Sequence, residues 1–514
     1  MKKWICFFLS IALLLAGMFF TGCGNGKTQA VQQIVIGEST DLGGYDPETN
    51  MSYYIRALIF NTLVELDADF KLQPALAERW EMTPDGKTWT FYLRKGVAFH
   101  DGTPLTAQIV KQNMDRLRTG MWRSFLPDIA DVQATDDLTV VFHLKSPSFI
   151  FASDLTVPSY SIVSPTALDV NGKVVKAIGT GPYILEFWQK DQDFVLKRND
   201  NYWGQAPKNE KLVFKVISDP DARAMALEAG MVDFISLRQS LTAAGRLAQN
   251  NKLKLEKRLG QTSEMLYFNV NNPVLKDLRV RKAVAHSLNI KEMIPGLLGD
   301  SAEPGHAFFS PVFGKYVMPK DVVLPYDLKQ AQEYLTAAGW QVGPDGVRMK
   351  DRVSLRVRIA FGAKNAEDSL LAGVIQNSLK EVGIIAELVP LEDAALMDAL
   401  KNKSYDLLMF GQFYIPHNEP SPHYLSGHYH PKAMYGLLTT PEITEAIDQL
   451  VITANNKERV ALHHKIQGLI SEQVPVIVLF HRNNIAAMKK NIMDYENSVG
   501  VWQVYRGLEK AYVQ

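Results

Sequence analysis

The N-terminal segment constrains what the rest of this chain can fold into more than any other feature. Two lysines precede an apolar run over residues 4–20, and the small residues Thr-Gly then lead into Cys23. A charged start, an apolar stretch and small residues at a cleavage point are typical of an export signal. The run is too short for a spanning helix, which needs about 20 apolar residues. We therefore expect a signal peptide over residues 1–22 and a mature chain that folds outside the cytoplasm.

The end of this segment also predicts a lipid anchor. It resembles a bacterial lipobox, in which the cysteine becomes the lipidated first residue of the mature protein, although Phe20 stands where leucine is usual. The resemblance implies that Cys23 carries the lipid. Residues 23–33 are mostly small and polar, which is typical of a flexible tether. The alternative is an N-terminal anchor that is not cleaved, and in both cases the bulk of the chain lies outside the membrane.

Cysteine usage limits how the exported part can be stabilised. The chain has only Cys6, inside the signal, and Cys23 at its end. After cleavage no pair of thiols is left for a disulfide or a zinc–thiolate site. The fold must therefore depend on a large hydrophobic core, and 514 residues are enough for two or three domains.

The charge balance excludes several partners. Lysine and arginine together number 55, and so do aspartate and glutamate, so no overall field attracts nucleic acid or an anionic membrane. The sequence has no low-complexity tracts and no repeats at the periods of solenoids or propellers. Helical and strand-like patterns alternate along the chain, which predicts a mixed α/β architecture.

Capping residues and apolar runs predict where several elements begin and end. Thr103-Pro104 is expected to open a helix, with threonine as the cap and proline in the first helical position. Asp219-Pro220 is expected to open a second helix, and Asp327 a third that ends at Gly339. Strand-like stretches lie at residues 34–37, 88–93, 139–144, 355–359 and 407–410.

Six stretches, in order along the chain, carry a resemblance to a known family. The longest is PALAERWEMTPDGKTWTFYLRKGVAFHDGTPLTAQIVKQNMDRL, which begins at Pro74. The others are IGTGPYILEFW from Ile178, RNDNYWGQAPK from Arg198, DPDARAMALEAGMVD from Asp219, NVNNPVLKDLRVRKAVAHSLN from Asn269 and DLKQAQEYLTAAGW from Asp327. This set is similar to the large solute-binding proteins of ABC importers for peptides and nickel, often called family 5. The resemblance covers essentially the whole mature chain.

The resemblance implies a two-lobed, periplasmic-binding-protein-like α/β fold of the class II, cluster C type, with a hinge and a ligand cleft between the lobes. Lobe I would comprise residues 31–270 and 484–514, with an inserted subdomain at about 75–177, and lobe II residues 271–483. A ligand that contacts both lobes would stabilise the closed form, which the importer recognises. The implied partners are an ABC permease and its ATPase subunits, and the protein is expected to be a monomer without a covalent cofactor.

An enzyme is the hypothesis from a different class. The sequence contains no G-x-S-x-G, S-x-x-K or H-E-x-x-H motif. An extracytoplasmic hydrolase that uses scattered carboxylates is the remaining enzymatic alternative. A binding protein needs no covalent chemistry, so we expect none.

A histidine-rich segment, residues 413–430, is the most informative region about the ligand. Four of the eleven histidines fall in it, at His417, His423, His428 and His430. Neutral imidazole is a common ligand of nickel, zinc, cobalt and copper, so all four are candidate metal ligands. Several prolines and a glycine predict a loop. The alternative is that these are loop histidines that are hydrogen-bonded or solvated.

Comparison within the family adds further candidates. Nickel-binding members carry a metal-ligating histidine in this region, and His430 or His428 is nearest by position. They also carry a cleft tryptophan, which Trp122 matches, and an arginine before a Ser-Pro or Ala-Pro pair that clasps the chelator's carboxylates. The matching residues 157–165 contain no arginine. Either the chelator is a different one, or another arginine, such as Arg123, takes this role.

Peptide-binding members instead place an aspartate in the segment corresponding to residues 413–425, where it pairs with the ligand's ammonium group. The nearby acid here is Glu419. Tyr53, Tyr414 and Tyr424 complete the ligand-binding candidates. The first hypothesis is import of Ni²⁺, or of Co²⁺ or Zn²⁺, as a complex with a small organic chelator. Import of oligopeptides or dipeptides is the second.

Overall fold

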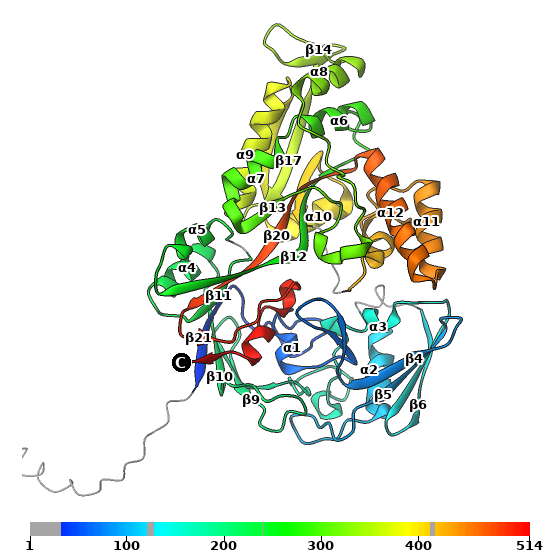
Figure 1. Cartoon of the computed structure of the whole chain (residues 1–514), viewed down its shortest axis with the longest axis vertical. Coiled ribbons are helices and arrows are strands. Elements are labelled where there is room, and N and C mark those ends of the chain that lie inside the picture. The colour runs from blue at the N-terminus through cyan, green and yellow to red at the C-terminus, as the bar shows by residue number, and fades with distance from the viewer. Residues whose placement is uncertain (1–31, 121–127, 239, 412–416) are drawn as a thin grey trace, which may run out of the picture. The chain divides into compact units, whose positions relative to one another are not determined.

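One large mixed sheet runs through the computed structural model, which describes residues 32–120, 128–238, 240–411 and 417–514 (Figure 1). From edge to edge the strands are β18 (Ile385–Leu391), β17 (Arg356–Gly362), β19 (Leu407–Gly411), β12 (Leu253–Phe268), β20 (Val476–Lys489), β11 (Phe234–Ser236), β1 (Gln33–Glu38), β10 (Lys211–Val216), β9 (Phe194–Arg198) and β8 (Tyr183–Trp188), and β13 (Ala302–Pro304) pairs with β20. Parallel pairs, such as β1 with β10, occur beside antiparallel ones, such as β10 with β9.

The two longest strands, β12 and β20, connect the two ends of this sheet. They pair antiparallel along most of their lengths, while β20 also pairs with β11 and β12 also pairs with β19. Their register shifts between Leu259 and Ser263. An irregularity of this kind bends a strand and increases its twist. Strands β12 and β20 thus join one part of the sheet, which begins at β11 and ends at β8, to the other part, which contains β19, β17 and β18 (Figure 1).

A second, four-stranded sheet has its own core. It consists of β4 (Ala77–Met82), β5 (Thr88–Leu93), β7 (Thr139–Leu144) and β6 (Ile129–Asp136), in that order. Side chains of β5 and β7 alternate between buried and half-buried, as expected where one face of a sheet is covered. Helix α2 (Ala107–Leu117) packs against β6 and β7. Phe91 and Phe142 form the centre of this core, with their rings 5.4 Å apart.

The remaining helices flank the sheets. They are α1 (Arg56–Ile59), α3 (Phe151–Asp154), α4 (Pro220–Glu228), α5 (Ala243–Ala248), α6 (Leu278–His286), α7 (Ile290–Leu298), α8 (Leu328–Ala337), α9 (Ala366–Glu381), α10 (Asp393–Asn402), α11 (Pro441–Ile452) and α12 (Asn456–Gln473). Helix α9 packs on β17 and β18, and α11 packs on α12. The short strands are β2 (Val64–Leu66), β3 (Leu72–Pro74), β14 (Gln341–Val342), β15 (Arg348–Lys350), β16 (Val353–Ser354), β21 (Ile492–Met493) and β22 (Tyr512–Val513).

Two of the three predicted helix starts are confirmed. The side chains of Asp219 and Asp327 each accept a hydrogen bond from a backbone N–H in the first turn of α4 and α8. The prediction at Thr103-Pro104 is wrong, because the cap of α2 is Thr106. Pro104 forms a β-bridge with Ala98 and the next N–H bonds to Val97, so tertiary pairing keeps these residues extended.

The predicted strands are confirmed with small shifts. Residues 88–93 and 139–144 are strands over the predicted bounds, and the strands predicted at 355–359 and 407–410 extend to Gly362 and Gly411. The predicted loop is wrong for one part of the histidine-rich segment, since His423–His428 forms a π-helical turn, η6. In the part of the chain that the structure describes, no helix has both the length and the hydrophobicity to cross a membrane.

Candidate ligand site

Two segments from distant parts of the sequence meet at the candidate site. Helix α3 carries the buried Ser153 and Asp154, and its Phe151 is fixed in the aromatic core of the four-stranded sheet. The Ser153 hydroxyl lies 2.9 Å from Oδ1 of Asn418 and accepts a hydrogen bond from the Asn418 N–H at 3.3 Å. Residues 153 and 418 fall in the two expected lobes. The contact therefore joins the histidine-rich segment to the other side of the expected cleft.

His417, beside this contact, is a buried histidine whose ring nitrogens are not used by the protein in a well-formed hydrogen bond within the described residues. Its Nδ1 lies 3.4 Å from Oδ1 of Asp154, which is long for a hydrogen bond. Burial lowers the pKa of His417 to about 3, although the charge of Glu419 and the Ser153 carbonyl act in the opposite direction. The imidazole is therefore neutral near pH 7 and has a lone pair to offer.

The pKa of Asp154 is shifted in the opposite direction to that of His417. Burial, and after it the charge of Glu419, raise the pKa of Asp154 well above its usual range, while Arg459 partly opposes the shift. The carboxyl group thus favours its neutral form in this position, where it can donate a hydrogen bond as well as accept one.

Glu419 is already held by several protein groups. It accepts hydrogen bonds from Nε and Nη2 of Arg459, from Nε2 of His463 at 3.2 Å and from the Ser421 hydroxyl. Burial raises the pKa of Glu419, but the bond from His463 and the charge of Arg459 outweigh it and bring the pKa down to about 2. This carboxylate is ionised and well satisfied, so it has little capacity left for a ligand's ammonium group.

A cavity of about 1260 Å³ opens beside these residues. Asp154 and Ser148 line it from one segment, and Ser421 and Arg459 from the other. Further lining residues are Asp128, Ser146, Pro147, Ile150, Pro422, Leu425, Pro431, Lys432, Met434, Thr439, Thr440, Pro441, Thr444, Glu445, Asp448, Gln449, Val451 and Ile452. The space is large enough for a small organic ligand.

The other three histidines of the segment lie in different surroundings. The rings of His423 and His428 are 4.4 Å apart within a cluster of buried aromatic side chains, and His428 stacks on Tyr267. Burial lowers the pKa of His428 to about 3. His430 lies with its Nε2 3.2 Å from Asp448 Oδ1, while its Nδ1 accepts from the N–H of Lys432. The structure thus brings His423 and His428 together.

The tyrosines also differ in position. Tyr424 is fully buried, and its ring packs against Phe309 and His463. Tyr53 is only half-buried, packs edge-on against Trp502, and has the Arg56 guanidinium 5.0 Å from its ring centre. Among the sequence-predicted residues, Cys23, Trp122, Arg123 and Tyr414 lie outside the described residues.

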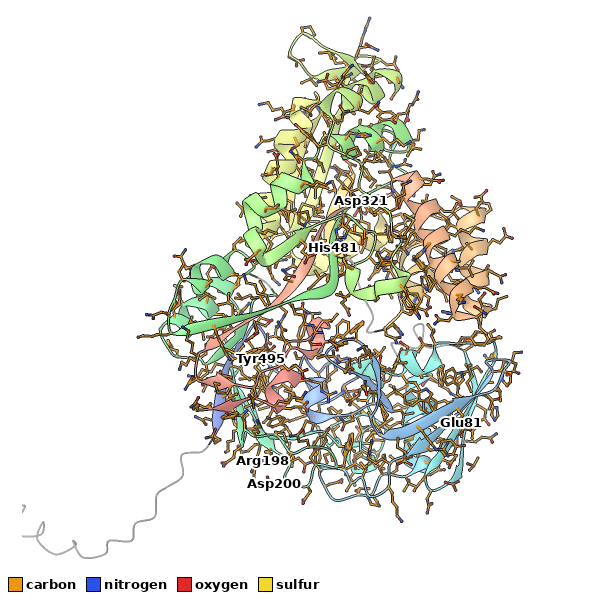
Figure 2. All side chains as sticks on the ribbon, in the orientation of Figure 1. Glu81, Arg198, Asp200, Asp321, His481 and Tyr495 are labelled. Atoms are coloured by element: carbon orange, nitrogen blue, oxygen red, sulfur yellow. The ribbon has the colours of Figure 1, made fainter. Side chains whose placement is uncertain are left out.

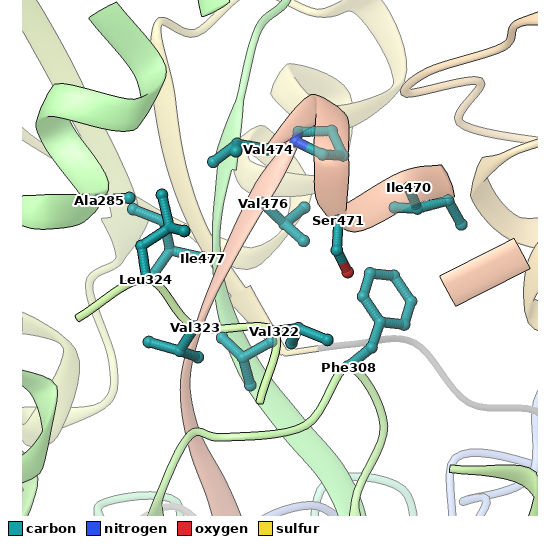
Figure 3. Close-up of a pocket in the computed structure, with 12 residues that line it drawn as sticks. Ala285, Phe308, Val322, Val323, Leu324, Ile470, Ser471, Val474, Val476 and Ile477 are labelled. Carbon is teal, nitrogen blue, oxygen red and sulfur yellow. The ribbon is translucent and has the colours of Figure 1, made fainter. Parts of the chain in front are cut away.

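Two other places in the fold, a buried histidine and a small hollow, lie outside this site. His481 on β20 lies 2.8 Å from the Ser263 hydroxyl, and burial, together with His306, lowers its pKa to about 3 (Figure 2). A small hollow of about 20 Å³ lies between Phe308 and the start of β20, and Figure 3 shows its mostly apolar lining. That volume holds a water molecule at most. Across the described ranges, no three His, Cys, Asp or Glu side chains converge closely enough to hold a metal ion.

Several residues of the site had no signal in the sequence. Asp154 and Arg459 stand in no motif, and each takes its place through contacts with residues far along the chain. Asp154 was detectable only as an acid inside an otherwise apolar stretch, and Arg459 as a cation near a helix start.

Comparison with known proteins decides the family. Residues 71–434 match the bacterial extracellular solute-binding proteins, family 5, middle region. This chain belongs to that family. It is 28% identical over 483 residues to the nickel-binding periplasmic protein of Escherichia coli strain K12, which spans 90% of this chain and 91% of that protein. It is 26% identical to the glutathione-binding protein GsiB of Salmonella paratyphi A, over 89% of this chain and 90% of that protein.

The fold agrees with solved members of the family. The crystal structure of NikA from Brucella suis in complex with Fe(III)-EDTA superposes with a TM-score of 0.83 at 24% identity, and covers 94% of this chain and 100% of that one. The expected two-lobed α/β fold is thereby confirmed. By their descriptions the relatives are extracellular or periplasmic solute-binding proteins. This chain is accordingly an extracytoplasmic solute-binding protein.

Proposed function

We propose that this family 5 protein captures nickel, or a related transition metal such as cobalt or zinc, as a complex with a small organic chelator. It then delivers the complex to an ABC permease and its ATPase subunits. The nickel-binding relative, which is similar over nine tenths of this chain, supports the choice of metal. Lobe I (31–270 and 484–514) and lobe II (271–483) would close on the ligand.

The observation that carries the proposal is the state of His417. A buried, neutral imidazole that lacks a well-formed hydrogen bond is unfavourable unless a ligand completes its contacts. Neutral imidazole is also the form that binds a transition metal. We assign His417 as the first candidate donor to the metal.

A chelator is part of the proposal because the described residues contain no set of three converging metal-binding side chains. Most of the metal's coordination positions would therefore be filled by the chelator, and one by the protein. His423, His428 and His430 remain further candidate donors. The ring nitrogens of His428 also have no well-formed hydrogen bond within the described residues, but its ring is stacked on Tyr267 inside the aromatic cluster, and His430 already contacts Asp448.

Calorimetric titration with the nickel complex of L-histidine tests the proposal. We expect wild type to bind it, and His417→Ala to bind at least about tenfold more weakly because one of few protein donors is lost. His464→Ala is the matched control, since this partly exposed histidine of α12 contacts the Lys315 carbonyl and, within the described residues, does not line the cavity. Unchanged affinity in His417→Ala would remove His417 from the site. A wild type that binds no nickel complex would refute the metal proposal.

A peptide ligand is the second candidate function, and it is favoured by the glutathione-binding relative. The extensive contacts of Glu419 with Arg459 and His463 speak against its role as the ammonium partner. Titration with a pool of short peptides, run beside the nickel complex, separates the two candidates.

The proposal also includes the route to the cell surface. Residues 1–22 would be removed as a signal peptide, and Cys23 would carry a lipid that anchors the mature chain to the membrane. The following residues up to 33 would form the tether.

A further inference from the structure

A buried charge cluster lies where the large sheet passes from one expected lobe to the other. Arg482, on β20, donates from Nη2 to Oε2 of Glu264 on β12 at 3.3 Å, and from Nη1 to Oε1 of Glu367 on α9 at 3.2 Å. Asp368, the next residue of α9, completes the cluster. All four residues are at most 8% exposed. The cluster thus places three carboxyl groups around one guanidinium, away from solvent.

The charges of this cluster do not balance. If all three acids were ionised, the net charge would be −2, and a buried charge is costly unless an opposite charge compensates it. Glu264 and Glu367 share the guanidinium, whereas Asp368 has no ion-pair partner among the described residues. It accepts a hydrogen bond from the Asn365 amide at 3.0 Å, its Oδ1 has no partner within the same residues, and from β17 the uncharged Gly362 faces it. Asp368 is therefore the acid that the cluster satisfies least.

The pKa of Asp368 reflects this position. Burial, and after it the negative charge of Glu264, raise the pKa of Asp368 to about 8. Glu367 adds to the rise, while the charge of Arg482 and the bond from Asn365 act in the opposite direction. Burial also raises the pKa of Glu264, and its contact with Arg482 opposes that shift. Because Glu264 bonds to the guanidinium and Asp368 does not, the proton that the two acids hold at pH 7 resides on Asp368.

Arg482 also connects this cluster to the other lobe. Its Nη1, which contacts Glu367, donates to the backbone carbonyl of Arg238 at 2.9 Å as well. Arg238 follows β11 and is held there by Glu38 at the end of β1 and by the Tyr54 ring, whose centre lies 3.8 Å from the guanidinium. Arg238 belongs to the expected lobe I and Glu367 to lobe II, while β12 and β20 run between the two (Figure 1). A rotation of one lobe against the other must therefore change the distance between Arg238 and Glu367.

We infer that this cluster is a protonation-dependent latch of the hinge: the closed arrangement of the lobes holds a proton on Asp368, and opening releases that proton to water. Ser153 and Asn418 are in contact across the expected cleft, so the structure has the closed arrangement. In it, the Arg238 carbonyl and the two other acids engage Arg482. When the lobes part, the bond to the carbonyl breaks and the guanidinium turns towards Asp368, which then ionises. The latch goes beyond the proposed function, since it needs the two-lobed fold but no particular ligand.

The direction of the pH effect follows from proton binding. Since the closed form binds the proton more tightly than the open form, a fall in pH favours closure and a rise in pH favours opening. The effect begins above an ordinary carboxyl pKa of about 4. It ends near pH 8, where Asp368 loses its proton in the closed form as well. Between these limits one coupled proton changes the ratio of closed to open molecules by up to about tenfold per pH unit.

Distances between spin labels on the two lobes test the latch without any ligand. The chain has only Cys6 and Cys23, so a mature chain with Cys23→Ala takes labels only at introduced cysteines. Ser146→Cys and Ile452→Cys place one label on each wall of the cavity, at exposed positions, so opening lengthens the distance between them. Pulsed electron paramagnetic resonance should show that the fraction with the shorter distance falls from pH 5 to 8 and is constant from 8 to 9. Asp368→Asn, whose neutral amide imitates the protonated acid, should keep the low-pH distribution throughout.

Two further variants make the result specific. Asp393→Asn is the matched control, because this exposed acid pairs with Lys364 outside the cluster, and it should follow wild type. Glu264→Gln removes a negative charge beside Asp368, so the midpoint of the change should move to lower pH. A wild-type distribution that is constant from pH 5 to 8, or an equal change in Asp368→Asn, overturns the inference. If Asp368→Asn does not fold, Glu264→Gln decides, and an unshifted midpoint overturns the latch.

Discussion

Nη1 of Arg56 donates a hydrogen bond to the hydroxyl of Ser159 at 2.6 Å, although 103 residues separate the two in the sequence. This contact brings a guanidinium to a stretch of chain that carries no arginine of its own.

The contact predicts a loss of stability in Ser159→Ala. Arg56 would keep its charge and its bonds to Met51, but the buried Nη1 would lose its acceptor. We expect the free energy of unfolding to fall by about 2 kcal/mol, because hydrogen bonds to charged groups contribute more than neutral ones. Ser161→Ala is the control, since within the described residues its hydroxyl makes a neutral bond to the Pro158 carbonyl, and it should cost about 1 kcal/mol. Urea unfolding measures both, and equal losses would contradict a special role of the charged contact.

The limits of sequence-based prediction follow from the range of the interactions. The caps at Asp219 and Asp327 and the strands at 88–93 and 139–144 depend on neighbours a few residues away, so they could be predicted. The start of α2 could not, because the bridge between Ala98 and Pro104 forms only in the folded chain.

The candidate site also contains features that the sequence predicts and features that depend on contacts in the folded chain. The histidine-rich segment and its family could be recognised from residue types and motifs. Whether a given histidine lies beside Asp154 or inside the aromatic cluster depends on packing, and His417 differs from His428 in this respect without any local signal. The positions of the Arg56 and Arg459 side chains depend on partners 103 and 40 residues away.

The buried pair of Glu419 and Arg459 predicts a large loss of stability in Arg459→Ala. Removal of the guanidinium leaves a buried carboxylate with too few donors, which costs about 3–5 kcal/mol. Lys364→Ala is the control, because its pair with Asp393 is exposed and should matter by less than about 1 kcal/mol. Urea unfolding monitored by circular dichroism gives both values. Comparable effects would show that the Glu419 pair is not structurally important.

Lipid anchoring predicts a change of location without a change of binding. Cys23→Ala removes the thiol that would be lipidated, so the protein should move from the membrane fraction to the soluble fraction. Its affinity for the ligand should stay that of wild type, since the substitution lies before the tether. Fractionation followed by immunoblotting checks the first point and calorimetry the second. A variant that stays in the membrane fraction would rule out the lipoprotein assignment.

The lowered pKa of the buried His481 predicts that the stability of the protein depends on pH. Burial, and after it the charge of His306, lower its pKa to about 3, against an ordinary value near 6.5 in the unfolded chain. Below pH 6.5 the unfolded chain therefore binds a proton that the folded protein rejects, and stability falls as pH decreases towards 3. The slope for this one group is about 1.4 kcal/mol per pH unit.

The variant His481→Gln removes this term and keeps a side chain that can bond to Ser263. At pH 8 the imidazole is neutral in both states, so the difference in unfolding free energy between variant and wild type reports only packing and hydrogen bonding. As the pH is lowered from 6.5 to 5, the variant should gain about 2 kcal/mol relative to wild type, because only wild type pays the protonation penalty. Urea unfolding at pH 8, 6.5 and 5 measures the difference. A difference that stays constant over this range would mean that His481 accepts its proton in the folded protein as easily as in the unfolded chain.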